Sequence, residues 1–159
     1  MSIDYELLLA QAKALIDNES DALANLANIN ALLFDQLSDL NWVGVYLMRD
    51  GQLVLGPFVG KSACTRIDLG RGVCGTAMAT QQVQRVDDVH AFEGHIACDS
   101  ASESEIVFPI SSATKQYGVF DIDSPTQARF SSADEVGLAP IARLIARILD
   151  ADASSVGLA

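Results

Sequence analysis

Apolar residues recur three and four positions apart in two segments near the N-terminus, 4–17 and 20–37. This spacing places the apolar side chains on one face of an α-helix, so each segment is predicted to form an amphipathic helix. Ser20 is the expected N-cap of the second helix, because a serine side chain can accept a hydrogen bond from a backbone N–H of the first turn.

A third helical pattern covers residues 133–151, with an apolar stripe made of Leu138, Ile141, Leu144, Ile145 and Ile148. Ser131 or Ser132 is expected near its start. Pro140 lies in the early part of the pattern and is expected to shift the true start of the helix toward it. The tail, 151–159, is predicted to fray.

Between the helical patterns, the sequence contains short runs of residues that are typical of β-strands. Residues 41–48 are followed by Asp50-Gly51 and then by 52–58, which is typical of a β-hairpin. Residues 106–110 and 116–123 are expected to form a second pair of strands. Helices that flank a run of hairpin-connected strands predict an α+β domain, an antiparallel sheet with helices packed on one face.

The segment 60–104 is long, polar and poor in clear strands, and it contains all three cysteines and both histidines. A long irregular stretch in a compact domain is commonly a binding or catalytic region. We therefore expect the functional site to involve this segment.

The overall composition limits the class of protein. Half of the residues are hydrophobic, so the chain is expected to fold, as one domain over 1–159. The formal charge of −11 disfavours binding to nucleic acid or to an anionic membrane. The N-terminus lacks the basic region of a signal peptide, and no uncharged apolar run reaches the roughly 18 residues of a membrane span. A cytoplasmic protein is expected.

The three cysteines, Cys64, Cys74 and Cys98, allow several roles. An odd number argues against a structural disulfide framework in a reducing compartment and leaves core thiols, metal ligands or redox-active thiols. His90, His95 and Cys98 have the spacing H-x4-H-x2-C, which is part of a zinc pattern but lacks the usual CxxC pair. A hydrolase nucleophile is disfavoured, because no motif marks an oxyanion hole.

Strand alternation brings together polar and aromatic side chains. Trp42 and Tyr46 share a strand face with Gly44 between them, which suggests a pocket floor or two core aromatic residues. Asp121 and Asp123 also share a face, which indicates a polar cavity or a solvated surface.

Two further motifs add to the expected cavity. Glu103 and Glu105 flank the start of the strand at 106–110, and if the strand begins near Glu105, the carboxylate of Glu105 could face the same cavity as Asp121 and Asp123. GRGVCG, at 70–75, lacks the end of a P-loop and is expected to turn into a short helix. The backbone N–H groups at that helix start could hold a carboxylate.

Four stretches together carry a family resemblance: NWVGVYL (41–47), GPFVGKSACTRIDLGRGVCGTA (56–77), DDVHAFEGHIACDSASESEIVFPI (87–110) and GVFDIDSP (118–125). They resemble the free methionine-(R)-sulfoxide reductases, a family built on the GAF domain. The resemblance extends from about residue 20 to the C-terminal helix. It implies a GAF-like sheet of about six antiparallel strands, with the N- and C-terminal helices on one face and a ligand cavity on the other.

The resemblance also implies the reaction, which is reduction of free L-methionine (R)-sulfoxide to methionine. The family pattern makes Cys98 the attacking cysteine and Cys64 the resolving one, with Cys74 as an alternative relay. It assigns Glu105, Asp121 and Asp123 to the substrate site, with Trp42 and Tyr46 as its aromatic wall. Glu105 and Asp123 are also expected to take part in catalysis. We expect at least one of the three carboxyls to be protonated until substrate binds.

The implied electron source is thioredoxin, and ultimately NADPH, with no bound cofactor and no metal ligand. The expected partners are free methionine sulfoxide and thioredoxin, and a sheet of this kind often forms a homodimer through its helices. The chain departs from the family pattern at Asp87-Asp88, where many relatives have a proline first, and at Phe108 and Phe120, where smaller residues are common. The rival interpretation is a non-catalytic GAF-type sensor of a small metabolite; it does not account for three thiols near one pocket.

Overall fold

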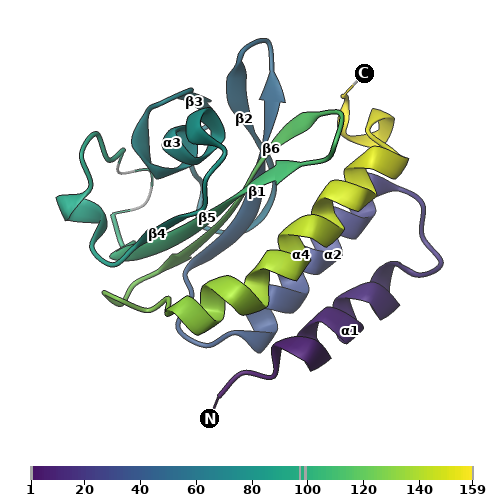
Figure 1. Ribbon diagram of the computed structural model, residues 1–159, viewed down its shortest axis with the longest axis horizontal. Coiled ribbons are helices and arrows are strands. Elements are labelled where there is room, and N and C mark those ends of the chain that lie inside the picture. Colours follow the sequence, from purple (N-terminus) through teal and green to yellow (C-terminus); the bar gives the residue numbers. More distant parts are fainter. Residues whose placement is uncertain (1, 97, 99, 159) are drawn as a thin grey trace.

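A computed structural model describes residues 2–96, 98 and 100–158. Three helices, α1 (Tyr5–Ile16), α2 (Ala22–Gln36) and α4 (Ser132–Ala151), lie together on one face of a twisted sheet (Figure 1). The short helix α3 (Gly72–Thr80) lies on the opposite face. The strands are β1 (Trp42–Arg49), β2 (Gln52–Gly60), β3 (Arg66–Asp68), β4 (Gln84–Val86), β5 (Ser104–Ser111) and β6 (Gln116–Ser124).

The six strands are antiparallel and follow the order β3-β2-β1-β6-β5-β4. The β1–β2 hairpin turns at Asp50 and Gly51, whose φ values of 50° and 80° suit the tight turn expected from an Asp-Gly pair. The centre of the sheet is the pairing of β1 with β6, which joins the two hairpins across most of the chain. The expected α+β class with a GAF-like antiparallel sheet is confirmed.

Alternation along the strands separates two apolar clusters. Val43, Val45 and Leu47 of β1 point toward the helical layer and belong to the larger core. Trp42 and Tyr46 point to the opposite face, where they pack with α3 in a smaller cluster. The helical layer therefore stabilises one face of the sheet, and the other face is available for a pocket.

One expected helix cap was wrong. The N-cap of α2 is Asp21 rather than Ser20, because its carboxylate accepts a hydrogen bond from the Ala24 N–H at 2.8 Å. Helix α4 begins at Ser132 after the N-cap Ser131, so the expected start near these serines is confirmed, but Pro140 lies in its interior and does not shift the start toward it.

A capping box explains why α4 begins well before Pro140. Ser131 and Asp134 exchange hydrogen bonds between side chain and backbone there. The carbonyl that loses its partner to Pro140 belongs to Val136, which is 75% exposed, so solvent can satisfy it.

The tail and the middle segment are more ordered than the patterns predict. Residues 154–156 form a short 3-10 helix, η2 (Ser154–Val156), and Val156 and Leu158 are buried. The hydroxyl of Ser155 accepts a hydrogen bond from the Ala22 N–H at 2.9 Å, so the tail packs on the start of α2 instead of fraying.

The segment 60–104 contains β3, α3 and β4, and also a 3-10 helix, η1 (Val89–Ala91). Each of the two strands is three residues long, which is too short to show a period of its own. No helix in the described part of the chain is long and apolar enough to cross a membrane.

Candidate functional site

The register of the sheet sets three side chains in one row. Asp123 of β6 lies directly opposite Trp42 of β1 and opposite Glu105 of β5. Asp121 lies two residues further along β6, opposite Gly44 and Val107. Residues that lie opposite each other or two apart on one strand share a face, so the three carboxyl groups point to the same side as Trp42. The sequence prediction that these groups share a cavity is consistent with this geometry.

The aromatic wall has one more member than the sequence pattern suggests. The ring of Trp42 stacks on Tyr46, with centroids 5.8 Å apart, and on Phe58 of β2, with centroids 5.3 Å apart. Of the two alternatives, packed aromatic residues are observed and an open pocket floor at Gly44 is not, since Trp42 and Tyr46 are both buried. A Cβ atom there would lie 2.5 Å from both the Trp42 ring and Phe58, so the space is occupied by the indole. The glycine is needed because it lets the indole fold over the strand.

Two of the three cysteines form a disulfide bond. Cys64 follows β2, Cys98 precedes β5, and their Cα atoms lie 5.3 Å apart. The polar ends of the aromatic wall hold the Cys64 loop: Tyr46 Oη donates to the Cys64 carbonyl at 2.9 Å, and Trp42 Nε1 donates to the Lys61 carbonyl at 3.2 Å. The side chains that were expected to line the pocket therefore also position one of its sulfur atoms.

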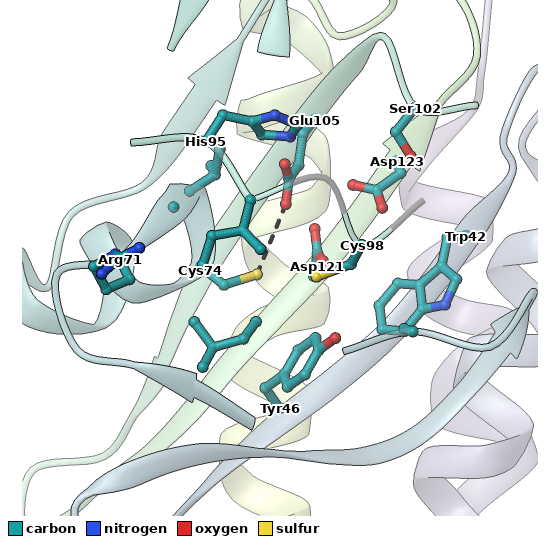
Figure 2. Close-up of a pocket in the computed structure, with 15 residues that line it drawn as sticks. Trp42, Tyr46, Arg71, Cys74, His95, Cys98, Ser102, Glu105, Asp121 and Asp123 are labelled. Carbon is teal, nitrogen blue, oxygen red and sulfur yellow. Dashed lines mark hydrogen bonds between the residues drawn. The ribbon is translucent and has the colours of Figure 1, made fainter. Parts of the chain in front are cut away.

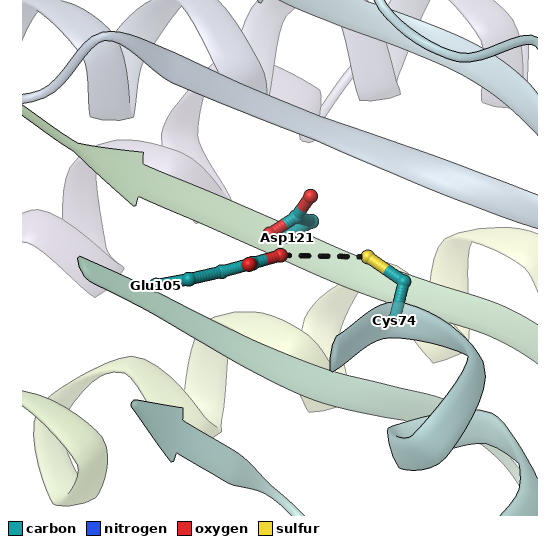
Figure 3. Close-up of side chains that lie close together, drawn as sticks. All are labelled: Cys74, Glu105 and Asp121. Atoms are coloured by element: carbon teal, nitrogen blue, oxygen red, sulfur yellow. Dashed lines mark hydrogen bonds between the residues drawn. The ribbon is translucent and has the colours of Figure 1, made fainter. Parts of the chain in front are cut away.

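Cys74 is the free cysteine, and it lies on α3 with 5% of its surface exposed. Its Sγ donates a hydrogen bond to Glu105 Oε1 at 3.7 Å (Figure 3). Burial raises the pKa of the Cys74 thiol well above its usual value, and the charges of Asp121, Glu105 and Asp123 raise it further. Cys74 is consequently a neutral thiol at physiological pH.

The carboxyl groups of Asp121 and Glu105 are buried, with 5% and 8% of each residue exposed. Burial raises the pKa of Asp121 well above its usual value, and the charges of Asp123 and Glu105 add to the effect. Burial also raises the pKa of Glu105, although hydrogen bonds with Asp121, Cys74 and Asp123 oppose this. The pair therefore holds a proton that two separate carboxylates in water would lose.

These groups surround a cavity of about 40 Å³ (Figure 2). Seven of the eight residues assigned to the site from the sequence line it: Trp42, Tyr46, Cys74, Cys98, Glu105, Asp121 and Asp123. The eighth, Cys64, is bonded to Cys98. Arg71, His95, Ile96 and Ser102 also line the cavity and were not assigned to the substrate site from the sequence. Arg71 lies within the glycine-rich motif 70–75 and is the N-cap residue of α3, and this motif was the available signal for it.

The histidines do not assemble the partial zinc pattern. His90 lies at the protein surface, where its Nε2 is 3.4 Å from Glu103 Oε2. His95 turns to the cavity, and the centroids of the two imidazole rings are 6.0 Å apart. Burial and the neighbouring His90 lower the pKa of His95. Since Cys98 is bonded to Cys64, its sulfur is not available to a site with both histidines.

Known proteins are similar to this chain over nearly its whole length. Residues 24–150 match the family model of the GAF domain. The chain is 54% identical over 145 residues to the free methionine-R-sulfoxide reductase of Escherichia coli strain K12, covering 91% of this chain and 88% of the relative. It belongs to the free methionine-(R)-sulfoxide reductase family.

Two further members of this reductase family are similar to the chain. The free methionine-R-sulfoxide reductase of Saccharomyces cerevisiae is 41% identical over 148 residues, which cover 88% of this chain and 82% of the yeast protein. The X-ray structure of the enzyme from Neisseria meningitidis, solved in complex with its substrate, superposes with a TM-score of 0.91 at 40% identity. The match covers 98% of this chain and 96% of that one. The family resemblance recognised in the sequence motifs is confirmed.

Burial of the acid pair is expected to affect stability in a way that depends on pH. Asp121→Asn is expected to raise the free energy of unfolding relative to wild type, by an amount that grows with pH. Because the pKa of Asp121 is raised in the folded state, the unfolded chain loses the proton first as the pH rises above about 3.8. Each further pH unit then lowers the stability of the wild-type protein by about 1.4 kcal/mol per retained proton.

Urea unfolding at pH 4, 6 and 8 measures this difference. The variant should gain most at pH 8 and least at pH 4, because pH 4 is close to the unfolded-state pKa of about 3.8 and little of the difference has accumulated there. Asp17→Asn, at an exposed position at the end of α1, is the matched control and should show no such trend. An offset between Asp121→Asn and wild type that is the same at all three pH values would contradict the buried, protonated state of Asp121.

Proposed function

We propose that the protein reduces free L-methionine (R)-sulfoxide to L-methionine, with Cys98 as the nucleophile and Cys64 as the resolving thiol. The observation that carries the proposal is the Cys64–Cys98 disulfide beside an acid-lined cavity, in a chain of this reductase family. A disulfide between two loops that line a cavity is the expected end state of a thiol-dependent reduction.

The cavity offers complementary groups for each part of the free amino acid. The aromatic wall of Trp42, Tyr46 and Phe58 suits the sulfur and its methyl group, because sulfur packs favourably against aromatic rings. The carboxyl cluster suits the ammonium group. The substrate carboxylate can bind near Arg71 and the N-terminal end of α3. Among the described residues that line the cavity, Arg71 is the only arginine or lysine.

In the first step, the Cys98 thiolate attacks the sulfoxide sulfur, and the sulfoxide oxygen receives a proton as the S–O bond weakens. The buried acid pair Asp121 and Glu105 can supply this proton, because its raised pKa values keep a proton available at neutral pH. Transfer of the oxygen to Cys98 leaves a sulfenic acid and releases methionine. The sulfoxide is reduced by two electrons, and Cys98 is oxidised by two.

In the second step, the Cys64 thiol attacks the sulfur of the sulfenic acid, the S–O bond breaks, and water leaves. The resulting disulfide is reduced by an external dithiol, for which we propose thioredoxin, with electrons ultimately from NADPH. The cavity beside the disulfide holds about three water molecules, which is less than the volume of an amino acid. Reduction of the disulfide therefore precedes entry of the next substrate.

Cys74 is a poor candidate for the resolving role while it remains buried and neutral, because the attacking species in thiol exchange is the thiolate. It is better suited to hold the proton network around Glu105, since its thiol donates to that carboxylate. We therefore assign the relay step to Cys64 and treat Cys74 as part of the acid cluster.

A coupled assay tests the proposed function. With thioredoxin, thioredoxin reductase and NADPH, the protein should oxidise NADPH with the separated R isomer of free methionine sulfoxide and not with the S isomer. Without reductant, one equivalent of the R isomer should remove two of the three thiols of the reduced protein. Peptide-bound methionine sulfoxide is the matched control and should be inert, because the cavity must accommodate both charged groups of the free amino acid.

A non-catalytic metabolite sensor gives a different result in the same experiment. Such a protein would bind the free sulfoxide with all three thiols retained. Retention of all three, together with no NADPH oxidation for either isomer, would rule out the proposed reaction.

A further inference from the structure

Three possible metal-binding atoms, one sulfur and two carboxylate oxygens, lie close together in the lining of the cavity. The Sγ of Cys74 and one carboxylate oxygen from each of Glu105 and Asp121 lie within 4.8 Å of one another, and all three residues are buried. They come from α3, β5 and β6, as Figure 3 shows. Because two of the residues lie on paired strands, the backbone holds their spacing.

The distances suit a small thiophilic cation. Zinc binds thiolate sulfur at about 2.3 Å and carboxylate oxygen at about 2.0 Å in tetrahedral sites, so a sulfur and an oxygen on one zinc ion lie about 3.5 Å apart. The Cys74 Sγ and Glu105 Oε1 atoms are 3.7 Å apart. The pair therefore needs little movement to become one edge of a zinc tetrahedron.

The side chain of Asp121 gives a second, independent indication of a bound cation, besides the spacing of the three donor atoms. Its Oδ1 atom is buried, and it has no hydrogen-bond partner within the described residues. Asp121 lines the cavity, and only 5% of its surface is exposed. A buried carboxylate oxygen without a partner is costly, so a bound cation or water is the usual reason for one. The cavity of about 40 Å³ has room for a cation with one or two waters.

We propose that Cys74, Glu105 and Asp121 form a site for Zn²⁺, and that the ion inhibits the enzyme by occupying the place of the substrate ammonium group. The site exists in the disulfide form, because none of its three ligands takes part in the Cys64–Cys98 bond. Binding is independent of the proposed function, whereas the inhibition rests on it.

The disulfide form makes the metal site directly observable. Once Cys64 and Cys98 are joined, Cys74 is the one remaining thiol of the chain. Co²⁺ commonly replaces Zn²⁺ and, when bound to a thiolate, shows a charge-transfer band in the near ultraviolet. In the oxidised protein this band can come only from Cys74.

The experiment titrates Co²⁺ into the oxidised protein and then displaces it with Zn²⁺. The wild type should develop the thiolate band at one equivalent and lose it when Zn²⁺ is added. Cys74→Ser should show no band. Glu105→Gln, which keeps the thiol, should weaken Co²⁺ binding roughly tenfold or more, as expected for loss of one ligand. A wild-type protein that shows no band would overturn the proposal.

The matched control concerns a second, surface cluster of metal-binding residues: Asp88, His90 and Glu103. Co²⁺ bound there would give no thiolate band. His90→Ala should therefore keep the band at wild-type intensity. A band that disappears in His90→Ala, or persists in Cys74→Ser, would contradict the assignment of the ligands.

Kinetics test the inhibition separately. Zn²⁺ should raise the KM for free methionine (R)-sulfoxide without lowering kcat, and the rise should be at least tenfold smaller in Cys74→Ser. A cobalt band with no effect of Zn²⁺ on KM would refute the overlap with the ammonium position. If the protein has no sulfoxide reductase activity, the cobalt titration still decides whether the metal site exists, so the two failures are distinguishable.

Discussion

Cys98→Ser is expected to abolish turnover, with a loss of roughly 10³-fold or more in kcat in the thioredoxin-coupled assay. A serine hydroxyl remains protonated at neutral pH and is a weak nucleophile unless a base activates it, and the acids around this cavity cannot act as one while they hold a proton. The variant should also retain all of its remaining thiols when it is mixed with free methionine (R)-sulfoxide in the absence of reductant.

Trp42 provides the control for this variant, since it is the single tryptophan of the chain and lines the cavity. Free methionine sulfoxide should change the fluorescence of Trp42 in the reduced Cys98→Ser protein, which would show that the pocket is intact and only the chemistry is lost. Undiminished activity of Cys98→Ser would overturn the assignment of the nucleophile.

Cys64→Ser is expected to complete a single round of reduction and then stop. Mixed with excess free methionine (R)-sulfoxide, it should form about one methionine per protein and accumulate a sulfenic acid on Cys98, because the partner that forms the disulfide is missing. Thioredoxin-coupled turnover should fall roughly 100-fold or more, since thioredoxin acts on a disulfide. Cys74 cannot replace Cys64, because its thiol is buried and hydrogen-bonded to Glu105.

Mass spectrometry after trapping with a sulfenic-acid-specific diketone measures this result. The adduct should be found on Cys98 in Cys64→Ser and not in the wild type, which forms the disulfide instead. Steady-state turnover of Cys64→Ser at the wild-type rate, without an adduct, would show that another thiol resolves the intermediate.

The fold was largely predictable, because β1, β2, β5, β6 and the three large helices are long enough to show their periodicity. Apolar residues recur every two residues in the strands and every three to four residues in the helices. The errors have two different origins. Asp21 caps α2 in place of Ser20 through a local hydrogen bond, and both residue types are good N-caps, so the pattern does not choose between them. The tail is ordered by burial of Val156 and Leu158, a tertiary contact that no local period reveals. The strands β3 and β4 are three residues each and exist because longer neighbours pair with them.

The site was predictable to the extent that strand alternation determines which side chains share a face. Alternation alone brings Trp42 and Tyr46, or Asp121 and Asp123, to one side, but the register that aligns Glu105 with Asp123 is set by the sheet. The roles of the cysteines came from the family resemblance, because sequence spacing does not show which loops meet. Arg71, His95 and Phe58 required coordinates, since each reaches the cavity or its wall through the packing of α3, a loop or a neighbouring strand.

The three cavity carboxyl groups and the disulfide bond lie in different kinds of structural element. Glu105, Asp121 and Asp123 are anchored in paired strands, whereas Cys64 and Cys98 lie in two connections outside them. In the proposed reaction, the disulfide can form and break by rearrangement of these two connections while the strands that hold the carboxyl groups keep their shape. Because the cysteines and the carboxyl groups lie in different elements, replacing the two connections that contain Cys64 and Cys98 is a short evolutionary route between a repair enzyme and a receptor with the same fold.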